Sequence, residues 1–197
     1  MKRSSLVLKR IFDFPLASGG LIFLFPLGVL FALGVQLEDG GPLFYFQERW
    51  GKGGKKFKAY KFRTMVDGAD QEGGLRPAEE NDTRVTRVGK FLRSTAMDEL
   101  PQLLNIWRGD MSFVGPRALA VEELDPSRPG FSERHQIRPG LTGEAQVYAS
   151  RDASIDEKFR YDLDYIQNRT FGRDLKLLFL SVWITLRGKW ESREKKI

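Results

Sequence analysis

The chain has 197 residues, of which 41% are hydrophobic and 29% charged, and its formal net charge is +6 at pH 7. This length suffices for one sizeable core. The absence of cysteine excludes a disulfide framework, a thiolate nucleophile and a zinc–thiolate site, and the single histidine excludes a multi-histidine metal site within one chain. The positive charge favours anionic partners such as phosphates, nucleotides, nucleic acid or an anionic membrane surface, without choosing among them.

An uncharged segment at residues 14–37 predicts contact with lipid, because about 20 apolar residues suffice to cross a bilayer. Pro26 lies near the middle of the segment and removes a helical hydrogen bond, so we expect a kink there. A spanning helix would place Lys9 and Arg10 on one side of the membrane and the rest of the chain on the other. A re-entrant hairpin would return both ends to the same face, as the basic residues after the segment favour. The residues alone leave both geometries open.

Recurring aromatic residues predict two strands at residues 43–49 and 55–65, joined by a glycine-rich turn at residues 51–54. We expect a mobile loop at residues 67–82, which lack an apolar period, and irregular chain between residues 115 and 143. Apolar periodicity predicts helices at residues 96–107 and 155–166. Residues 174–187 fit either an interfacial amphipathic helix or an ordinary core-packing helix.

Two adjacent carboxylates, Asp98 and Glu99, fall in the first turn of the helix expected at residues 96–107. Thr95 can serve as its N-cap, and we expect Pro101 to lie close enough to the start to leave the turn intact. The positive end of the helix dipole would then favour an ionised Asp98 and a phosphate bound beside it. The same pattern is also that of a simple capping box. These residues alone therefore leave catalysis and capping open.

Several ordered sequence blocks around the carboxylate pair indicate what it does. The blocks are residues 9–13, 46–49, 60–65, 86–93, 98–99, 109–117 and 138–143. In this order and spacing they make the chain resemble the bacterial sugar transferases, in particular the monotopic polyprenyl-phosphate phosphoglycosyl transferases in their small form, which has only the catalytic core. The resemblance runs almost end to end, so it is far more specific than any single motif.

The resemblance implies transfer of a phosphosugar from a UDP-sugar to a polyprenyl phosphate, usually undecaprenyl phosphate, giving a polyprenyl diphosphosugar and UMP. This reaction initiates assembly of bacterial glycoconjugates such as exopolysaccharide, O-antigen or glycoprotein. Asp98 would be the nucleophile and would carry a covalent aspartyl-phosphosugar intermediate. Glu99 would act on the metal or on the acceptor phosphate. Mg²⁺ is the expected cofactor, with Asp98 and Glu99 as its candidate ligands.

Basic side chains and one glycine-containing turn are the candidate substrate-binding residues, because a guanidinium fork matches a diphosphate and glycine lets the backbone approach a nucleotide. They are Lys61, Arg63, Arg93, Arg117, Arg138, Gly140, Thr142, Gly143 and Arg151. The resemblance favours Lys61, Arg93 and Arg117, which lie in its most characteristic blocks. Taken singly, each basic residue also fits an ordinary solvated surface charge. His135 is expected to be structural.

The predicted fold is mixed α/β, with a re-entrant membrane anchor at residues 1–40 and a cytoplasmic catalytic domain at residues 41–197. The anchor is a helix–break–helix kinked at Phe25 and Pro26, where Phe25 replaces the serine usual in the family. The catalytic domain combines a small β-hairpin with helices, some of them interfacial, and rests on the bacterial inner membrane. We expect no nucleic-acid partner, and a homo-oligomer fits the resemblance. A non-catalytic membrane-anchored scaffold or binding module is the main alternative, and a basic nucleic-acid binder is a third.

Overall fold

The computed structural model describes residues 3–69, 82–150, 152–190 and 196–197, and has the mixed α/β character that the sequence predicts. Its helices are α1 (Arg3–Phe23), α2 (Phe25–Asp39), α4 (Arg87–Ser94), α5 (Gln102–Arg108), α6 (Phe131–Arg134), α7 (Glu144–Tyr148), α8 (Ile155–Asn168) and α9 (Phe171–Leu186). Its strands are β1 (Phe44–Trp50), β2 (Lys56–Phe62), β3 (Ser112–Val114) and β4 (Gly140–Thr142). Short 3₁₀ turns cover Lys52–Gly54, Met97–Glu99 and Val121–Glu123.

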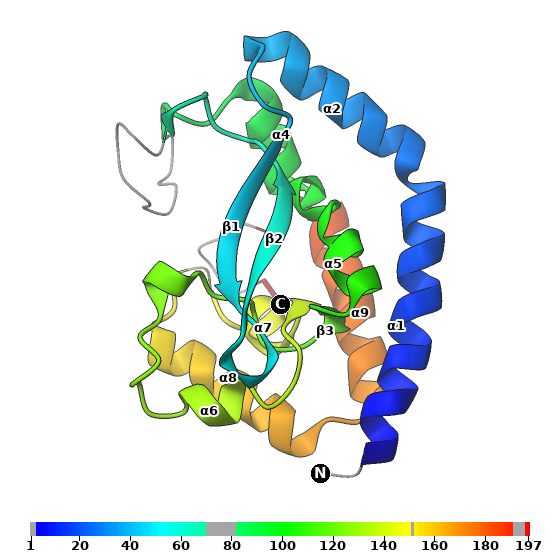
Figure 1. The fold of residues 1–197 in the computed structure, drawn as a ribbon, viewed down its shortest axis with the longest axis vertical. Coiled ribbons are helices and arrows are strands. Elements are labelled where there is room, and N and C mark those ends of the chain that lie inside the picture. Colours follow the sequence, from blue (N-terminus) through cyan, green and yellow to red (C-terminus); the bar gives the residue numbers. More distant parts are fainter. Residues whose placement is uncertain (1–2, 70–81, 151, 191–195) are drawn as a thin grey trace.

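The N-terminal helices α1 and α2 form a bent pair along one side of the molecule (Figure 1). The break falls at Leu24, and Pro26 follows in the first turn of α2, where its missing N–H leaves no helical bond unmade. Within the described residues, no single helix is long and apolar enough to cross a membrane. Residues 8–23 and 25–39 reach that length and composition only together, with a bend of 58° between them.

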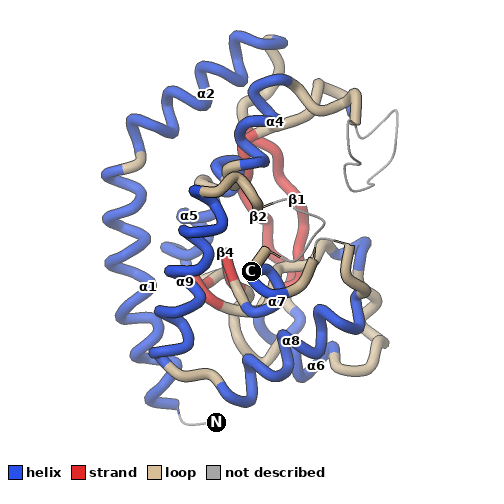
Figure 2. The backbone as a smooth tube through the Cα atoms, turned by 180° about the vertical axis from the view of Figure 1, so that it is seen from behind, coloured by secondary structure: helices blue, strands red, loops and turns tan. Residues whose placement is uncertain are grey.

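Helix α1 is packed onto the rest of the protein along α5, and Figure 2 shows it beside α5 and α9 from behind. Ala17 belongs to the main hydrophobic core. Lys9 Nζ lies 2.6 Å from Asp174 Oδ2 on α9, and the Arg10 guanidinium donates to the carbonyl oxygens of Ile106 and Trp107 at the end of α5. From the sequence we interpreted these two basic residues as charges that flank a membrane segment. In the structure they also fasten α1 to the globular part.

The β-hairpin predicted after the N-terminal segment is confirmed. β1 and β2 are antiparallel, with Phe44 opposite Phe62 and Trp50 opposite Lys56. Gly53 and Gly54 turn the chain with φ angles of 69° and 70°, which favour glycine. The second strand is shorter than predicted, because β2 ends at Phe62. Most of the loop expected at residues 67–82 lies outside the described residues.

The main core lies between α1, α5, α8, α9 and the parallel pair β3–β4. Helix α8 confirms the prediction for residues 155–166, and the Ser154 hydroxyl accepts from the Glu157 N–H at its start. Helix α9 buries Leu177 and Ile184 in the core, as the core-packing alternative requires. Its other face leaves Phe179 and Leu186 exposed, so the interfacial role remains a prediction.

Candidate active site

Asp98 and Glu99 lie in the 3₁₀ turn Met97–Glu99, which precedes α5. The continuous helix predicted at residues 96–107 is wrong, because Pro101 has no N–H and its ring would clash with the preceding turn of such a helix. α5 therefore begins only at Gln102. The predicted N-cap is wrong too: Thr95 is the C-cap of α4, where its hydroxyl donates to the Phe91 carbonyl, and Ala96 precedes the carboxylate turn without a side-chain cap.

A left-handed residue joins α4 to the carboxylate turn. Ala96 has φ 55°, and it is the only non-glycine residue with positive φ in the described ranges. Such a conformation is strained for a residue with a Cβ, so the packing around it must hold it in place. The reversal at Ala96 carries Asp98 and Glu99 onto the wall of a cavity, where both are buried.

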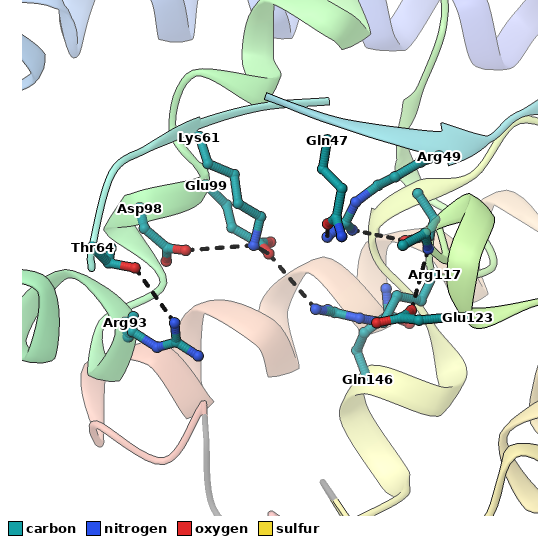
Figure 3. Close-up of polar contacts among 12 residues, drawn as sticks. Gln47, Arg49, Lys61, Thr64, Arg93, Asp98, Glu99, Arg117, Glu123 and Gln146 are labelled. Atoms are coloured by element: carbon teal, nitrogen blue, oxygen red, sulfur yellow. Dashed lines mark hydrogen bonds and ion pairs between the residues drawn. The ribbon is translucent and has the colours of Figure 1, made fainter. Parts of the chain in front are cut away.

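Lys61 on β2 lies between the two carboxylates (Figure 3). Its Nζ is 2.6 Å from Glu99 Oε1 and 3.4 Å from Asp98 Oδ2. The hairpin register pairs Lys61 with Tyr45, and alternation then places Gln47 and Arg49 on the same face as Lys61. The hairpin thus supplies both the cation that holds the carboxylate pair and a polar wall beside it.

Glu99 is a strongly ionised carboxylate. Burial alone would raise its pKa, but Lys61, Arg117 and Arg49 together lower the pKa to about 2. Arg117 NH2 lies 3.9 Å from Glu99 Oε1. A carboxylate with so low a pKa is a weak base and is well suited to hold a cation or to orient neighbouring groups.

Two buried arginines hold the backbone that carries Arg117. Arg134 is paired with Asp162 at 2.8 Å and also donates to the Arg117 carbonyl. Arg49 donates to the Ala118 carbonyl at 2.7 Å. Arg49, Arg134 and Asp162 are all almost inaccessible to solvent. The segment is therefore fixed from behind, and the Arg117 side chain is left at the cavity.

The cavity has a volume of about 990 Å³, which is enough for a nucleotide-sized ligand. Of the substrate-binding residues predicted from the sequence, it brings together Lys61, Arg63, Arg93 and Arg117 around the two carboxylates. Arg93 NH1 lies 3.4 Å from the Thr64 hydroxyl. Arg63 is engaged by Asp39 at the end of α2, with NH1 2.8 Å from Asp39 Oδ2, so its charge is already paired.

The turn at residues 138–143 was expected to bind substrate, but it lies away from the described cavity. Arg138, Gly140, Thr142 and Gly143 do not line the described cavity. A Cβ on Gly140 would lie 2.1 Å from the Gly115 backbone nitrogen, so this glycine is needed for close packing of two backbone segments. The Thr142 hydroxyl bonds to Ser181. The positions of these four residues give no support to direct contact with a ligand. Arg151, the remaining candidate, lies outside the described residues.

His135 has the structural position that the sequence favours. It is buried, and its Nδ1 lies 2.6 Å from the Phe131 carbonyl oxygen. Burial lowers its pKa to about 4, so it is neutral at physiological pH. It is not among the residues that line the described cavity, which gives no support to a role as catalytic base.

Sequence reasoning missed the far wall of the cavity, which contains Arg49, Glu123, Gln146, Lys158 and Asp162. Strand alternation from Lys61 could have found Arg49. No local pattern pointed to the others, because they come from the turn Val121–Glu123, from α7 and from α8, which meet only in the folded chain.

The carboxylate pair fits the part of a Mg²⁺ site that a protein usually provides. Mg²⁺ is commonly held by one or two carboxylates, with substrate phosphates and water completing its shell. Asp98 and Glu99 offer two carboxylates at the cavity wall. Among the described residues no group of three or more acidic or histidine side chains could hold a metal by itself, so a bound phosphate would have to complete the site.

Comparison with known proteins gives the same assignment as the sequence blocks. A model of the family described as "Bacterial sugar transferase" matches residues 4–188. EpsL, an uncharacterized sugar transferase of Bacillus subtilis, is 42% identical over 182 residues, which cover 90% of this chain and 86% of the relative. The exopolysaccharide production protein PSS of Rhizobium leguminosarum is 40% identical, with 93% of this chain and 98% of the relative covered.

A longer relative carries a named activity. The UDP-glucose:undecaprenyl-phosphate glucose-1-phosphate transferase of Klebsiella pneumoniae is 39% identical over 91% of this chain, but the match spans only 40% of that protein. The chain belongs to the bacterial sugar transferase family and is an enzyme of the phosphoglycosyl transferase class. The family predicted from the sequence blocks is therefore confirmed, and the non-catalytic scaffold is set aside.

Proposed function

We propose that the enzyme transfers a phosphosugar from a UDP-sugar to undecaprenyl phosphate or a related polyprenyl phosphate, and releases UMP. The observation that carries this proposal is the carboxylate pair Asp98 and Glu99, held by Lys61 at the wall of a cavity that Arg93 and Arg117 also line. A carboxylate nucleophile surrounded by cations suits attack on a diphosphate, whose negative charge must be neutralised. The names of the relatives support the same donor and acceptor classes.

In the first step, an Asp98 carboxylate oxygen attacks the phosphorus that bears the sugar. The bond from this phosphorus to the oxygen of UMP breaks, and the electron pair leaves with UMP. The product on the enzyme is a mixed anhydride between Asp98 and the phosphosugar. Asp98 suits this role better than Glu99, because Lys61 lies closer to Glu99 and the pKa of Glu99 is held at about 2.

In the second step, an oxygen of the polyprenyl phosphate attacks the same phosphorus and Asp98 leaves as a carboxylate. Lys61 and Arg117 balance the negative charge of the phosphates throughout. Asp98 and Glu99 would hold Mg²⁺, which when bound supplies further charge neutralisation at the diphosphate. The two-step scheme lets a water-soluble donor and a lipid acceptor use one site in turn.

The helix pair α1–α2 suits a membrane anchor that enters and leaves by one face. Ile22, Phe23 and Phe25 at the bend are at least 68% exposed, and a cluster of large apolar side chains so exposed calls for an apolar partner. Both arms are fastened to the same globular part, α1 through Lys9 and α2 through Asp39. We therefore place the bend in the cytoplasmic leaflet of the inner membrane, with the cavity on the cytoplasmic face.

Because the chain has no native cysteine, this topology can be tested by labelling. Single cysteines placed before Lys9 and after Glu38 should both react with a membrane-impermeant maleimide only from the cytoplasmic side. Labelling of the two positions from opposite sides would establish a spanning helix instead.

The catalytic proposal is tested by Asp98→Asn, which keeps the size of the side chain but makes it a poor nucleophile. UMP release from the UDP-sugar that supports wild-type turnover should fall by at least about a thousandfold, with an unchanged melting temperature. Asp125→Asn is a matched control on the exposed surface outside the cavity and should retain full activity. Normal UMP release by purified Asp98→Asn protein would refute the assignment.

A further inference from the structure

The far wall of the cavity contains a buried amide whose hydrogen bonds are unmade. Gln146 on α7 lines the cavity and is 6% exposed. Neither its Oε1 nor its Nε2 has a hydrogen-bond partner among the described residues. A buried polar group without a partner is unfavourable, and at a cavity wall a bound ligand or an ordered water can supply the missing hydrogen bonds.

The Gln146 amide lies next to Gly143. A Cβ on Gly143 would come within 2.9 Å of Gln146 Oε1, so the glycine leaves the room that the amide occupies. In Figure 3, Gln146 extends from α7 toward Arg117, on the opposite side of Arg117 from Lys61 and the carboxylates. The amide thus lies on the wall that also carries the charged residues Arg49, Glu123, Lys158 and Asp162.

The cations and the amide of the cavity suit different parts of a ligand. Lys61 and Arg117 are cations near the carboxylate pair and suit the diphosphate. Gln146 is neutral, and its amide offers donors and an acceptor side by side. A neutral group carrying both a donor and an acceptor matches it best. The donor substrate of the proposed function has such groups at both ends, in the imide edge of uracil and in neighbouring sugar hydroxyls.

We propose that Gln146 binds one of the two neutral ends of the UDP-sugar donor, the uracil or the sugar, through a paired set of hydrogen bonds in which the amide both donates and accepts. This inference rests on the proposed function for the identity of the ligand. Removing a group that bonds only to the ligand should weaken ligand binding without loosening the free protein.

The test is Gln146→Met, which keeps an unbranched side chain and removes both hydrogen-bonding groups. Its affinities for UMP and for UDP-glucose are measured by calorimetry, together with KM for the donor that supports turnover. We expect UDP-glucose binding about tenfold weaker, as loss of one to two hydrogen bonds gives. The melting temperature without ligand should be unchanged or higher, because the amide makes no bond in the free protein.

Gln102→Met is the matched control. Gln102 is 1% exposed, and its Nε2, but not its Oε1, is among the buried atoms without a partner in the described residues; it does not line the cavity. Its donor affinity should be that of the wild type. If UMP and UDP-glucose weaken equally in Gln146→Met, the amide binds the base; if only UDP-glucose weakens, the amide binds the sugar.

Unchanged UDP-glucose affinity in a folded Gln146→Met protein would overturn the proposal, as would an equal loss in Gln102→Met. A melting temperature lowered without any loss of affinity would show that the amide is structural. Failure of the proposed function would appear separately, as absence of UMP release by the wild-type enzyme with every UDP-sugar. The binding measurements would still decide the role of Gln146.

Discussion

The buried pair Arg134–Asp162 offers a test of how the site is held in place. The two side chains are 2% and 1% exposed, and Arg134 Nε lies 2.8 Å from Asp162 Oδ2. Replacing Arg134 by methionine keeps most of the buried volume but leaves the Asp162 carboxylate buried without its counter-ion. Breaking such a pair costs about 3–5 kcal/mol of the free energy of unfolding. For a chain of this size the melting temperature should fall by about 10 °C.

The loss of stability in Arg134→Met should depend on pH in a defined direction. Burial raises the pKa of Asp162 and Arg134 counteracts this, so removing Arg134 raises the pKa further. A carboxyl group whose folded-state pKa exceeds its unfolded value stabilises the fold most below that unfolded value, and this contribution is lost as the pH rises through the folded pKa. The deficit of Arg134→Met relative to the wild type should therefore shrink as the pH falls from 7.5 through the raised folded-state pKa of Asp162 toward its unfolded value.

Chemical denaturation of the detergent-solubilised variants at several pH values measures this deficit. The double variant Arg134→Met/Asp162→Leu removes both charges and should regain most of the lost stability. It should not regain full activity, because the bond from Arg134 to the Arg117 carbonyl is still missing. A single variant as stable as the wild type, or a double variant no more stable than the single one, would refute this reasoning.

Three further predictions concern the carboxylate pair, the anchor and the metal. Lys61→Met removes the closest cation from Glu99, so the pKa of Glu99 should rise from about 2. The acid limb of the pH–rate profile should then move to higher pH. An acid limb at the wild-type pH would show that Lys61 does not control the ionisation of Glu99. The Glu38 carboxylate accepts from the Arg87 and Val88 N–H groups at the start of α4, at 2.6 and 2.9 Å. Glu38→Ala should therefore lower the free energy of unfolding, measured by chemical denaturation, by about 1 kcal/mol. An unchanged free energy of unfolding would show that Glu38 does not cap α4. Chelation of divalent cations should abolish UMP release, and added Mg²⁺ should restore it; full activity in chelator would exclude the metal.

Local rules predicted the elements whose causes are local. The glycine turn and the aromatic residues predicted the hairpin, and an apolar period predicted α8. Pro26 predicted the bend between α1 and α2. The signal for α4 was also present, because the Thr86 hydroxyl caps it by accepting from Gly89, but its apolar face is too short to stand out.

The same rules failed at the carboxylate turn, where the effect of Pro101 was judged too small. The proline moves the start of α5, and Ala96 takes a left-handed conformation that no sequence rule favours for alanine. The wrongly predicted helix thus lies at the candidate site, and strained backbone is most often found at functional sites.

The choice of substrate-binding residues depended on partners distant in sequence. Arg63 was chosen for its charge, but Asp39, which lies 24 residues earlier, pairs with it. The turn at residues 138–143 was chosen for its glycines, and Gly140 is required by its packing against Gly115. Gln146 gave no signal at all, because an amide stands out only when the fold leaves it buried without a partner. Charge and glycine content alone cannot separate ligand contact from internal pairing.

The most direct test of the two-step reaction is incubation of the enzyme with Mg²⁺ and its UDP-sugar in the absence of polyprenyl phosphate. The mechanism predicts release of at most about one UMP per active site and one phosphosugar added to the peptide that contains Asp98, as measured by mass spectrometry. Polyprenyl phosphate should then discharge the adduct. With a donor already shown to support full turnover, UMP that appears only when both substrates are present, with no adduct on Asp98, would contradict the mechanism.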